Sequence, residues 1–164
     1  MSALNRAAPG VMMDGPCRGC TRWHPISRVA QLIQGTATCA CGNVRITCSG
    51  EPVRISMCHC LACQRRTGAP FGVQAWFQRE QLGISGRSSE YSRTADSGNS
   101  VIYQFCPTCG STVYWQLSSR PGLVAVALGM FADPNFPPPR VSVWERRRHP
   151  WTVRIADCHM EHDA

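Results

Sequence analysis

The sequence predicts a single, mainly β domain that is held together by metal ligands. Short stretches of alternating apolar and polar residues recur along much of the 164-residue chain, as half-buried strands require. Turn-forming residues separate these stretches and leave little room for helices. Seven of the eleven cysteines fall into three tight clusters with the spacing of zinc ligands. We expect the domain to span residues 35–155, between a flexible N-terminal extension (1–34) and a C-terminal tail (156–164).

The first half of the domain contains three expected strands, at 43–48, 52–57 and 72–77. The turn-forming residues 49–51 between the first two strands predict a hairpin. A short helix is expected over 61–66, because no breaker occurs there before the next glycine.

The second half contains a candidate strand pair, 91–93 with 100–105, around a turn-rich segment. Strands are also expected at 111–115 and at 123–128, and the latter is apolar on both faces, as in the centre of a sheet. The proline-rich segment 133–139 predicts an extended loop, because proline prevents both helical and ladder hydrogen bonding.

Composition and charge restrict the classes of function. The formal net charge is +7, and all 17 basic residues are arginines, with dense groups only at 65–66 and 146–148. Aromatic residues do not interleave with these arginines along the chain, which disfavours nucleic acid as the partner. A generally basic surface or an anionic small-molecule substrate fits better. The sequence predicts neither a secretion signal nor a membrane span, and metal-binding thiols suit the reducing cytoplasm.

Two of the cysteine clusters are pairs that are each followed by a glycine. A pair of this kind in a turn can direct both sulfurs at one point, and the glycine permits a positive φ just beyond it. Together the two pairs predict one closed four-sulfur zinc site that staples the fold. Its ligands would be Cys39, Cys41, Cys106 and Cys109.

The third cluster, Cys58-His59-Cys60-x-x-Cys63, predicts a different kind of site. Three thiolates around zinc leave one position for an exchangeable ligand, which is typical of catalytic zinc. They also leave one net negative charge, which the arginines at 65–66 can compensate. His59 lies between two ligands and is expected to point away, although ligation by it is one alternative. Closure of the site by water or Cys48 is another.

The extension contains a further possible half-site, Cys17-x-x-Cys20, with His24 four residues later. The alternative interpretation is that these cysteines are incidental, because no other cluster is left over to complete the site.

Taken together, these motifs resemble the glutathione-dependent formaldehyde-activating family, which also includes centromere protein V. The resemblance covers about residues 36–152, and it departs from the family at Ser142, where many relatives carry a histidine. The ordered set of three clusters is more specific than any one of them. The motifs that carry the resemblance are Cys39-x-Cys41-Gly42-x-Val44, Cys58-His59-Cys60-x-x-Cys63, Thr67-Gly68-Ala69, Phe105-Cys106-x-x-Cys109-Gly110-Ser111 and Pro150-Trp151.

The resemblance implies strongly bent antiparallel sheets, similar to those of zinc-containing methionine-R-sulfoxide reductases and Rab-binding accessory proteins. It implies two Zn²⁺ ions per chain: a structural one on Cys39, Cys41, Cys106 and Cys109, and a catalytic one on Cys58, Cys60 and Cys63. We expect the three-ligand site to lose its ion more readily. The family reaction joins glutathione and formaldehyde into S-hydroxymethylglutathione, which is carbon–sulfur lyase chemistry.

The leading hypothesis is therefore a zinc-dependent carbon–sulfur lyase acting on a thiol such as glutathione and an aldehyde. Arg65 is the candidate contact for a substrate carboxylate, and Trp76 and Phe77 are candidates for the pocket wall or the core. The alternative is a zinc-stapled binding module without catalysis. Methionine-sulfoxide reduction ranks last, because it needs a redox-active cysteine and only Cys48 and Cys158 are available.

Overall fold

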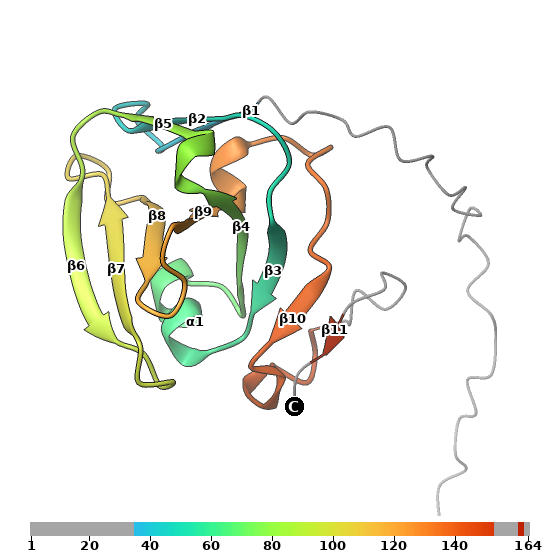
Figure 1. The fold of residues 1–164 in the computed structure, drawn as a ribbon. Coiled ribbons are helices and arrows are strands. Elements are labelled where there is room, and N and C mark those ends of the chain that lie inside the picture. Colours follow the sequence, from blue (N-terminus) through green and yellow to red (C-terminus); the bar gives the residue numbers. More distant parts are fainter. Residues whose placement is uncertain (1–34, 153–160, 163–164) are drawn as a thin grey trace, which may run out of the picture.

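The computed structural model describes residues 35–152 and 161–162 (Figure 1). The expected extension 1–34, most of the expected tail, and Cys17, Cys20 and Cys158 lie outside the described residues. Within the described part of the chain, no helix is long and apolar enough to span a membrane.

The described residues form two sheets. The smaller one is antiparallel, with the strand order β1 (Gly35–Thr38), β2 (Arg45–Cys48) and β5 (Leu82–Ser85). The larger sheet has eight strands. In spatial order they are β11 (Glu161–His162), β10 (Val141–Val143), β3 (Arg54–Cys58), β4 (Gly72–Gln78), β9 (Leu123–Ala127), β8 (Thr112–Leu117), β7 (Ser100–Phe105) and β6 (Ser89–Thr94).

Helices are few and short, so the prediction of a mainly β fold is confirmed. The α-helix, α1 (Leu61–Thr67), follows the third cysteine cluster as expected. Its last turn ends at Gly68, whose φ of 64° is the left-handed conformation that closes many helices. The three 3₁₀ helices are η1 (Arg79–Gln81), η2 (Leu128–Phe131) and η3 (Glu145–Arg147).

The expected hairpin at 49–51 is wrong, because β2 and β3 belong to different sheets. The turn residues bond to η1 instead of closing on their own strands. The Ser49 amide donates to the Gln81 carbonyl at 2.9 Å, and the Gln81 side-chain amide donates to the carbonyls of Ser49 and Glu51, both at 3.0 Å. The segment is therefore a crossover between sheets.

The expected pair of 91–93 with 100–105 is present as β6 and β7. Four other strands of the described residues, β1, β5, β10 and β11, have only two to four residues each and carry too weak a sequence pattern to be predicted. The strand β10 pairs in parallel with both of its neighbours, β3 and β11. All other neighbouring strands of the large sheet are antiparallel. The Arg140 and His59 amides extend the pairing of β10 with β3 by donating to Ile55 and Val143.

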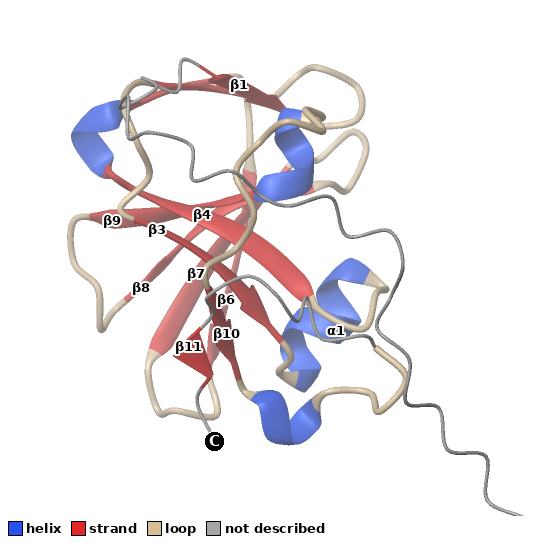
Figure 2. Cartoon of the chain, turned by 90° about the vertical axis from the view of Figure 1, so that its right-hand side faces the viewer, coloured by secondary structure: helices blue, strands red, loops and turns tan. Residues whose placement is uncertain are grey.

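The centre of the large sheet is buried on both faces, as the four successive buried residues of β9 show, whereas the edge strand β6 is mostly exposed. One face packs on the small sheet through residues such as Ile46, Phe77 and Val126. The opposite face carries a second apolar cluster that includes Trp76 and Trp115. Figure 2 shows β1 on one side of β4 and β9, and α1 on the other side.

One row of side chains crosses six strands on the α1 side of the large sheet. Its members are paired directly opposite one another from strand to strand, so they share a face. The row runs through Tyr91, Tyr103, Trp115, Ala125, Trp76 and Arg54. This row forms the aromatic floor on which the candidate site is built.

Candidate metal centres and active-site cavity

The four cysteines of the two pairs meet at one point, as predicted. Their sulfur atoms all lie within 4.8 Å of one another, and the Cys41 sulfur is 3.5 Å from that of Cys39 and 3.6 Å from that of Cys106. Sulfurs around tetrahedral zinc are about 3.8 Å apart, given the usual Zn–S bond of about 2.3 Å. The donor set and its spacing therefore fit a closed zinc site. We call this set the four-sulfur group.

The two halves of the four-sulfur group are built alike. In each half an amide reaches back to the first cysteine: Gly42 N–H donates to the Cys39 carbonyl, and Gly110 N–H donates to the Cys106 carbonyl. Both glycines have a positive φ, 79° and 74°, which the predicted turns require. The first half joins β1 to β2 and the second joins β7 to β8, so the group links the two sheets.

The pKa values of Cys39 and Cys109 are lowered, whereas the pKa of Cys41 is raised to about 12 because the hydrogen bond from the Asn43 backbone is outweighed by burial and by the three neighbouring sulfurs. The Val44 amide donates to the Cys39 sulfur at 3.2 Å. The Ser111 hydroxyl lies 3.3 Å from the Cys109 sulfur, and this hydrogen bond is the main cause that lowers the pKa of Cys109 to about 5.

Cys58, Cys60 and Cys63 also converge, and their sulfurs lie within 4.8 Å of one another. We call them the three-sulfur group. Cys58 ends β3, while Cys60 caps α1 by accepting the Cys63 amide at 3.4 Å. The cap bends the chain so that the end of the strand and the first turn of the helix aim at one point. Hydrogen bonds from Cys58 and then Cys63 lower the pKa of Cys60, and the same sharing raises the pKa of Cys58 and Cys63.

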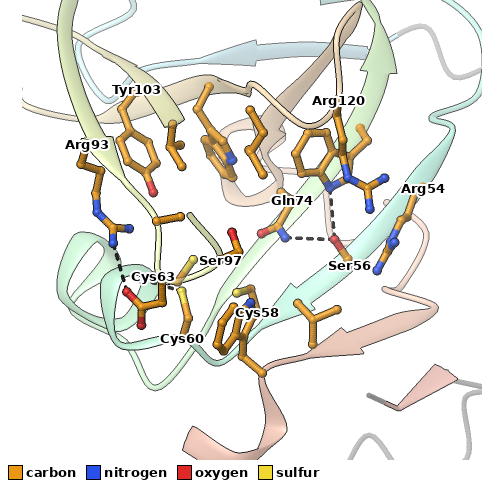
Figure 3. Close-up of a pocket in the computed structure, with 18 residues that line it drawn as sticks. Arg54, Ser56, Cys58, Cys60, Cys63, Gln74, Arg93, Ser97, Tyr103 and Arg120 are labelled. Atoms are coloured by element: carbon orange, nitrogen blue, oxygen red, sulfur yellow. Dashed lines mark hydrogen bonds and ion pairs between the residues drawn. The ribbon is translucent and has the colours of Figure 1, made fainter. Parts of the chain in front are cut away.

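The three-sulfur group opens into a cavity of about 340 Å³ on the α1 side of the large sheet (Figure 3). Tyr103, Trp115 and Trp76 from the aromatic row line it. The other face of β4 places Phe77 in the core between the sheets, so of the two pocket candidates Trp76 lines the cavity and Phe77 does not. Among the described residues, neither this cavity nor a second hollow beside α1 is lined by a cysteine of the four-sulfur group.

Polar groups in the cavity wall are held by their own hydrogen bonds. The buried Ser56 hydroxyl accepts from the Gln74 side-chain amide at 2.9 Å and from the Trp76 indole N–H at 3.2 Å. Tyr103 directs its hydroxyl into the cavity (Figure 3), and burial raises its pKa, so the phenol keeps its proton at neutral pH.

Three arginines line the same cavity from separate strands and loops. Arg54 comes from β3, Arg93 from β6, and Arg120 from the turn before β9. Arg93 donates to the Asp96 carboxylate at 3.4 Å, whereas the Arg120 guanidinium lies 5.4 Å from the centre of the Trp76 ring. Figure 3 places Arg93 on one side of the cavity, and Arg54 and Arg120 on the other. The cavity therefore suits a ligand with separated anionic groups.

The segment after β10 completes the wall. Trp144 lines the cavity and adopts a φ of 61°, which is rare for a large side chain and marks a constrained position. The Arg147 guanidinium lies 5.3 Å from the Trp144 ring centre and forms an ion pair with Asp96 in the β6–β7 turn. This ion pair joins two segments that are far apart in the sequence.

The structure separates the remaining candidates from this cavity. Arg65 is exposed on α1 and lines the second hollow, outside this cavity, so its position favours the cavity arginines for carboxylate recognition. His59 is buried outside the three-sulfur group with its ring edge against Phe71, at 5.8 Å between centroids. Cys48 is buried between the sheets, away from both groups, and burial raises its pKa to about 12.

The cavity arginines were missed by sequence reasoning. They are isolated along the chain: the strand register brings Arg54 and Arg93 onto one face, and Arg120 reaches the cavity from the turn before β9. The signal that could have found Arg54 and Arg93 is strand alternation, which places them on the same face as Cys58 and Tyr91 respectively.

Comparison with known proteins supplies a family for this architecture. Residues 34–147 match the model of the family described as glutathione-dependent formaldehyde-activating enzyme. No curated protein matches the chain. Among solved structures, the chain is similar to a Rhodobacter sphaeroides protein studied as a structural genomics target. The identity is 23%, the similarity covers 63% of this chain and 91% of that chain, and the TM-score is 0.48.

Proposed function

The chain belongs to the glutathione-dependent formaldehyde-activating enzyme family, and on that basis we propose that it is a zinc-dependent carbon–sulfur lyase. The reaction would form or cleave a thiol–aldehyde adduct of the S-hydroxymethylglutathione type. The observation that carries the proposal is the cavity: three convergent cysteines lie at its wall, and arginines line it on two sides.

Cys58, Cys60 and Cys63 would hold the catalytic zinc, and Cys39, Cys41, Cys106 and Cys109 would hold the structural one. When bound at the three-sulfur group, zinc supplies a position that keeps a substrate thiol ionised at neutral pH. The cysteines act as ligands in this assignment and not as nucleophiles. The need for free thiolates suits a reducing compartment such as the cytoplasm.

The reaction needs three contributions from the chain. The substrate sulfur attacks the aldehyde carbon, a C–S bond forms, and the carbonyl electron pair moves to the oxygen, which then takes a proton. The neutral Tyr103 hydroxyl in the cavity wall is a proton donor for that oxygen, and solvent restores its proton. The aromatic floor excludes water from part of the site, and the arginines orient the thiol through its carboxylates.

The experiment that tests this function follows adduct formation from ¹³C-labelled formaldehyde and glutathione by NMR exchange measurements. We expect the zinc-loaded protein to accelerate formation above the spontaneous rate. Cys60→Ser should abolish the acceleration and remove one zinc per chain while the far-UV circular dichroism stays unchanged. Cys48→Ala is the matched control, because Cys48 lies outside both sulfur groups, and it should keep both ions and the acceleration.

Two outcomes would count against catalysis. If the protein with both ions bound does not exceed the spontaneous rate, the lyase assignment is wrong. If it binds glutathione tightly without acceleration, and a macromolecular partner is still captured by Cys60→Ser, the chain is instead a zinc-stapled binding module.

A further inference from the structure

We propose that Arg66 is the counter-charge of the three-sulfur group, a positioning residue that sets how firmly this group holds its metal. The inference rests on the metal-binding part of the proposed function and is independent of the lyase reaction. It differs from the sequence hypothesis for Arg65: both arginines line the second hollow, but Arg65 is exposed whereas Arg66 is half-buried.

The Arg66 side chain is fixed on the aromatic floor of the site. It leaves the last turn of α1, and its guanidinium carbon lies 4.3 Å from the Trp115 ring centre and 5.6 Å from the Tyr103 ring centre. These two rings are directly paired across β7 and β8. Stacking of a guanidinium on aromatic faces at these distances is attractive and holds its plane in place.

The guanidinium also lies beside the backbone that carries the cysteines. A β-carbon built on the buried Gly72 would be 3.0 Å from an Arg66 terminal nitrogen and 3.4 Å from the Cys63 β-carbon. Gly72 is in turn paired with Cys58 across β3 and β4. The absence of a side chain at this position therefore leaves the space in which Arg66 approaches the three-sulfur group.

Among the described residues, no carboxylate forms an ion pair with Arg66. Its Nε atom is buried without a hydrogen-bond partner. By contrast, Arg93 and Arg147 both pair with Asp96. A partly buried cation is costly unless negative charge lies nearby, and the thiolates beside it are the available source.

Arg66 can then offset the charge of the metal group itself, whereas Arg54, Arg93 and Arg120 line the cavity beside it. Three thiolates and one Zn²⁺ carry one net negative charge, which a single guanidinium neutralises. Arg65 points from the exposed side of α1 and cannot serve in this way. Arg66, three residues after Cys63, lies on the same face of the helix as that ligand.

The test measures zinc affinity at each group, without glutathione or formaldehyde, by competition with a chromogenic chelator. We expect Arg66→Met to weaken binding at the three-sulfur group by roughly ten- to a hundredfold, as loss of partners around metal ligands does. The four-sulfur group should keep its affinity. Arg65→Met removes the same charge from the same helix and should change neither affinity.

Arg66→Lys should give an intermediate affinity, since lysine retains the charge but not the planar stacking. The proposal is overturned if Arg66→Met binds its second zinc as the unaltered chain does, or if Arg65→Met weakens it equally. Should Arg66→Met fail to fold, Arg66→Gln is judged by the same criterion. Because the readout is affinity in the absence of substrates, a protein with no lyase activity can still support or refute it.

Discussion

The two sulfur groups use the same side chain in opposite ways. The four-sulfur group gathers ligands from two turns that are 65 residues apart along the chain, and it joins two sheets. The three-sulfur group takes its ligands from one strand end and the helix that follows. The first closes a long loop and, among the described residues, lines neither of the two cavities, whereas the second closes almost no loop and opens into one of them. Ligand number and sequence separation therefore distinguish a site that stabilises the fold from one that is available to substrate.

The largest expected difference is in stability. Cys106→Ser removes a fully buried ligand of the four-sulfur group and should lower the thermal midpoint by more than about 10 °C, if the loss is near 3 kcal/mol. Cys60→Ser should change it little, because serine still caps α1. Thermal melts followed by circular dichroism measure both. Equal losses in the two variants would contradict the division of roles.

Metal removal should separate the groups next. A chelator is expected to take one zinc per chain while the strand signal of the circular dichroism spectrum is retained. The second ion should leave only as the protein unfolds, because a four-ligand site that links two sheets is lost together with the fold. Zinc release and the spectrum are recorded on the same sample. Simultaneous release of both ions, or early unfolding, would show that the groups are not independent.

A smaller effect tests what the cavity beside the three-sulfur group recognises. Arg120→Ala should raise the KM for glutathione roughly tenfold with less effect on kcat, since a hydrogen bond to a charged group contributes about 1.5–3 kcal/mol. The KM for 2-mercaptoethanol, which has no carboxylate, should stay unchanged. Arg65→Ala is the control outside the cavity. If Arg120→Ala raises the KM for both thiols equally, Arg120 supports the cavity wall and does not bind a substrate carboxylate.

The smallest effect concerns Cys48, which belongs to neither group. Because burial raises its pKa to about 12, the folded protein should alkylate at Cys48 much more slowly at pH 8 than the unfolded chain does. The raised pKa contributes to stability below pH 9 and the contribution is lost as the pH rises towards 12. Mass spectrometry after iodoacetamide labelling measures the rate. Rapid labelling of Cys48 in the folded state would contradict its buried placement.

Sequence reasoning found both sulfur groups because local spacing determines where cysteines in a turn can aim. It could not find the crossover at 49–51, since the same turn residues serve a hairpin or a link between sheets, and the choice depends on the distant Gln81. The short parallel strand β10 likewise depends on its partner β3 and not on its own pattern.

The sequence left the compensating charge of the three-sulfur group open between Arg65 and Arg66, and local reasoning could have ranked the two. Helix periodicity alone places the residue three positions after Cys63 on the ligand side, which selects Arg66. The cavity arginines were a harder problem, because their convergence needs the register of a sheet whose strand order is not consecutive.

The late position of β10 in the chain has a consequence for biosynthesis. All seven clustered cysteines have left the ribosome by the time residue 109 is exposed, yet the cavity wall that includes Val143 and Trp144 is translated more than thirty residues later. A nascent chain can therefore gather both sets of thiols around metal before the pocket exists. Translation order thus favours a domain that is metallated first and becomes competent for substrate last.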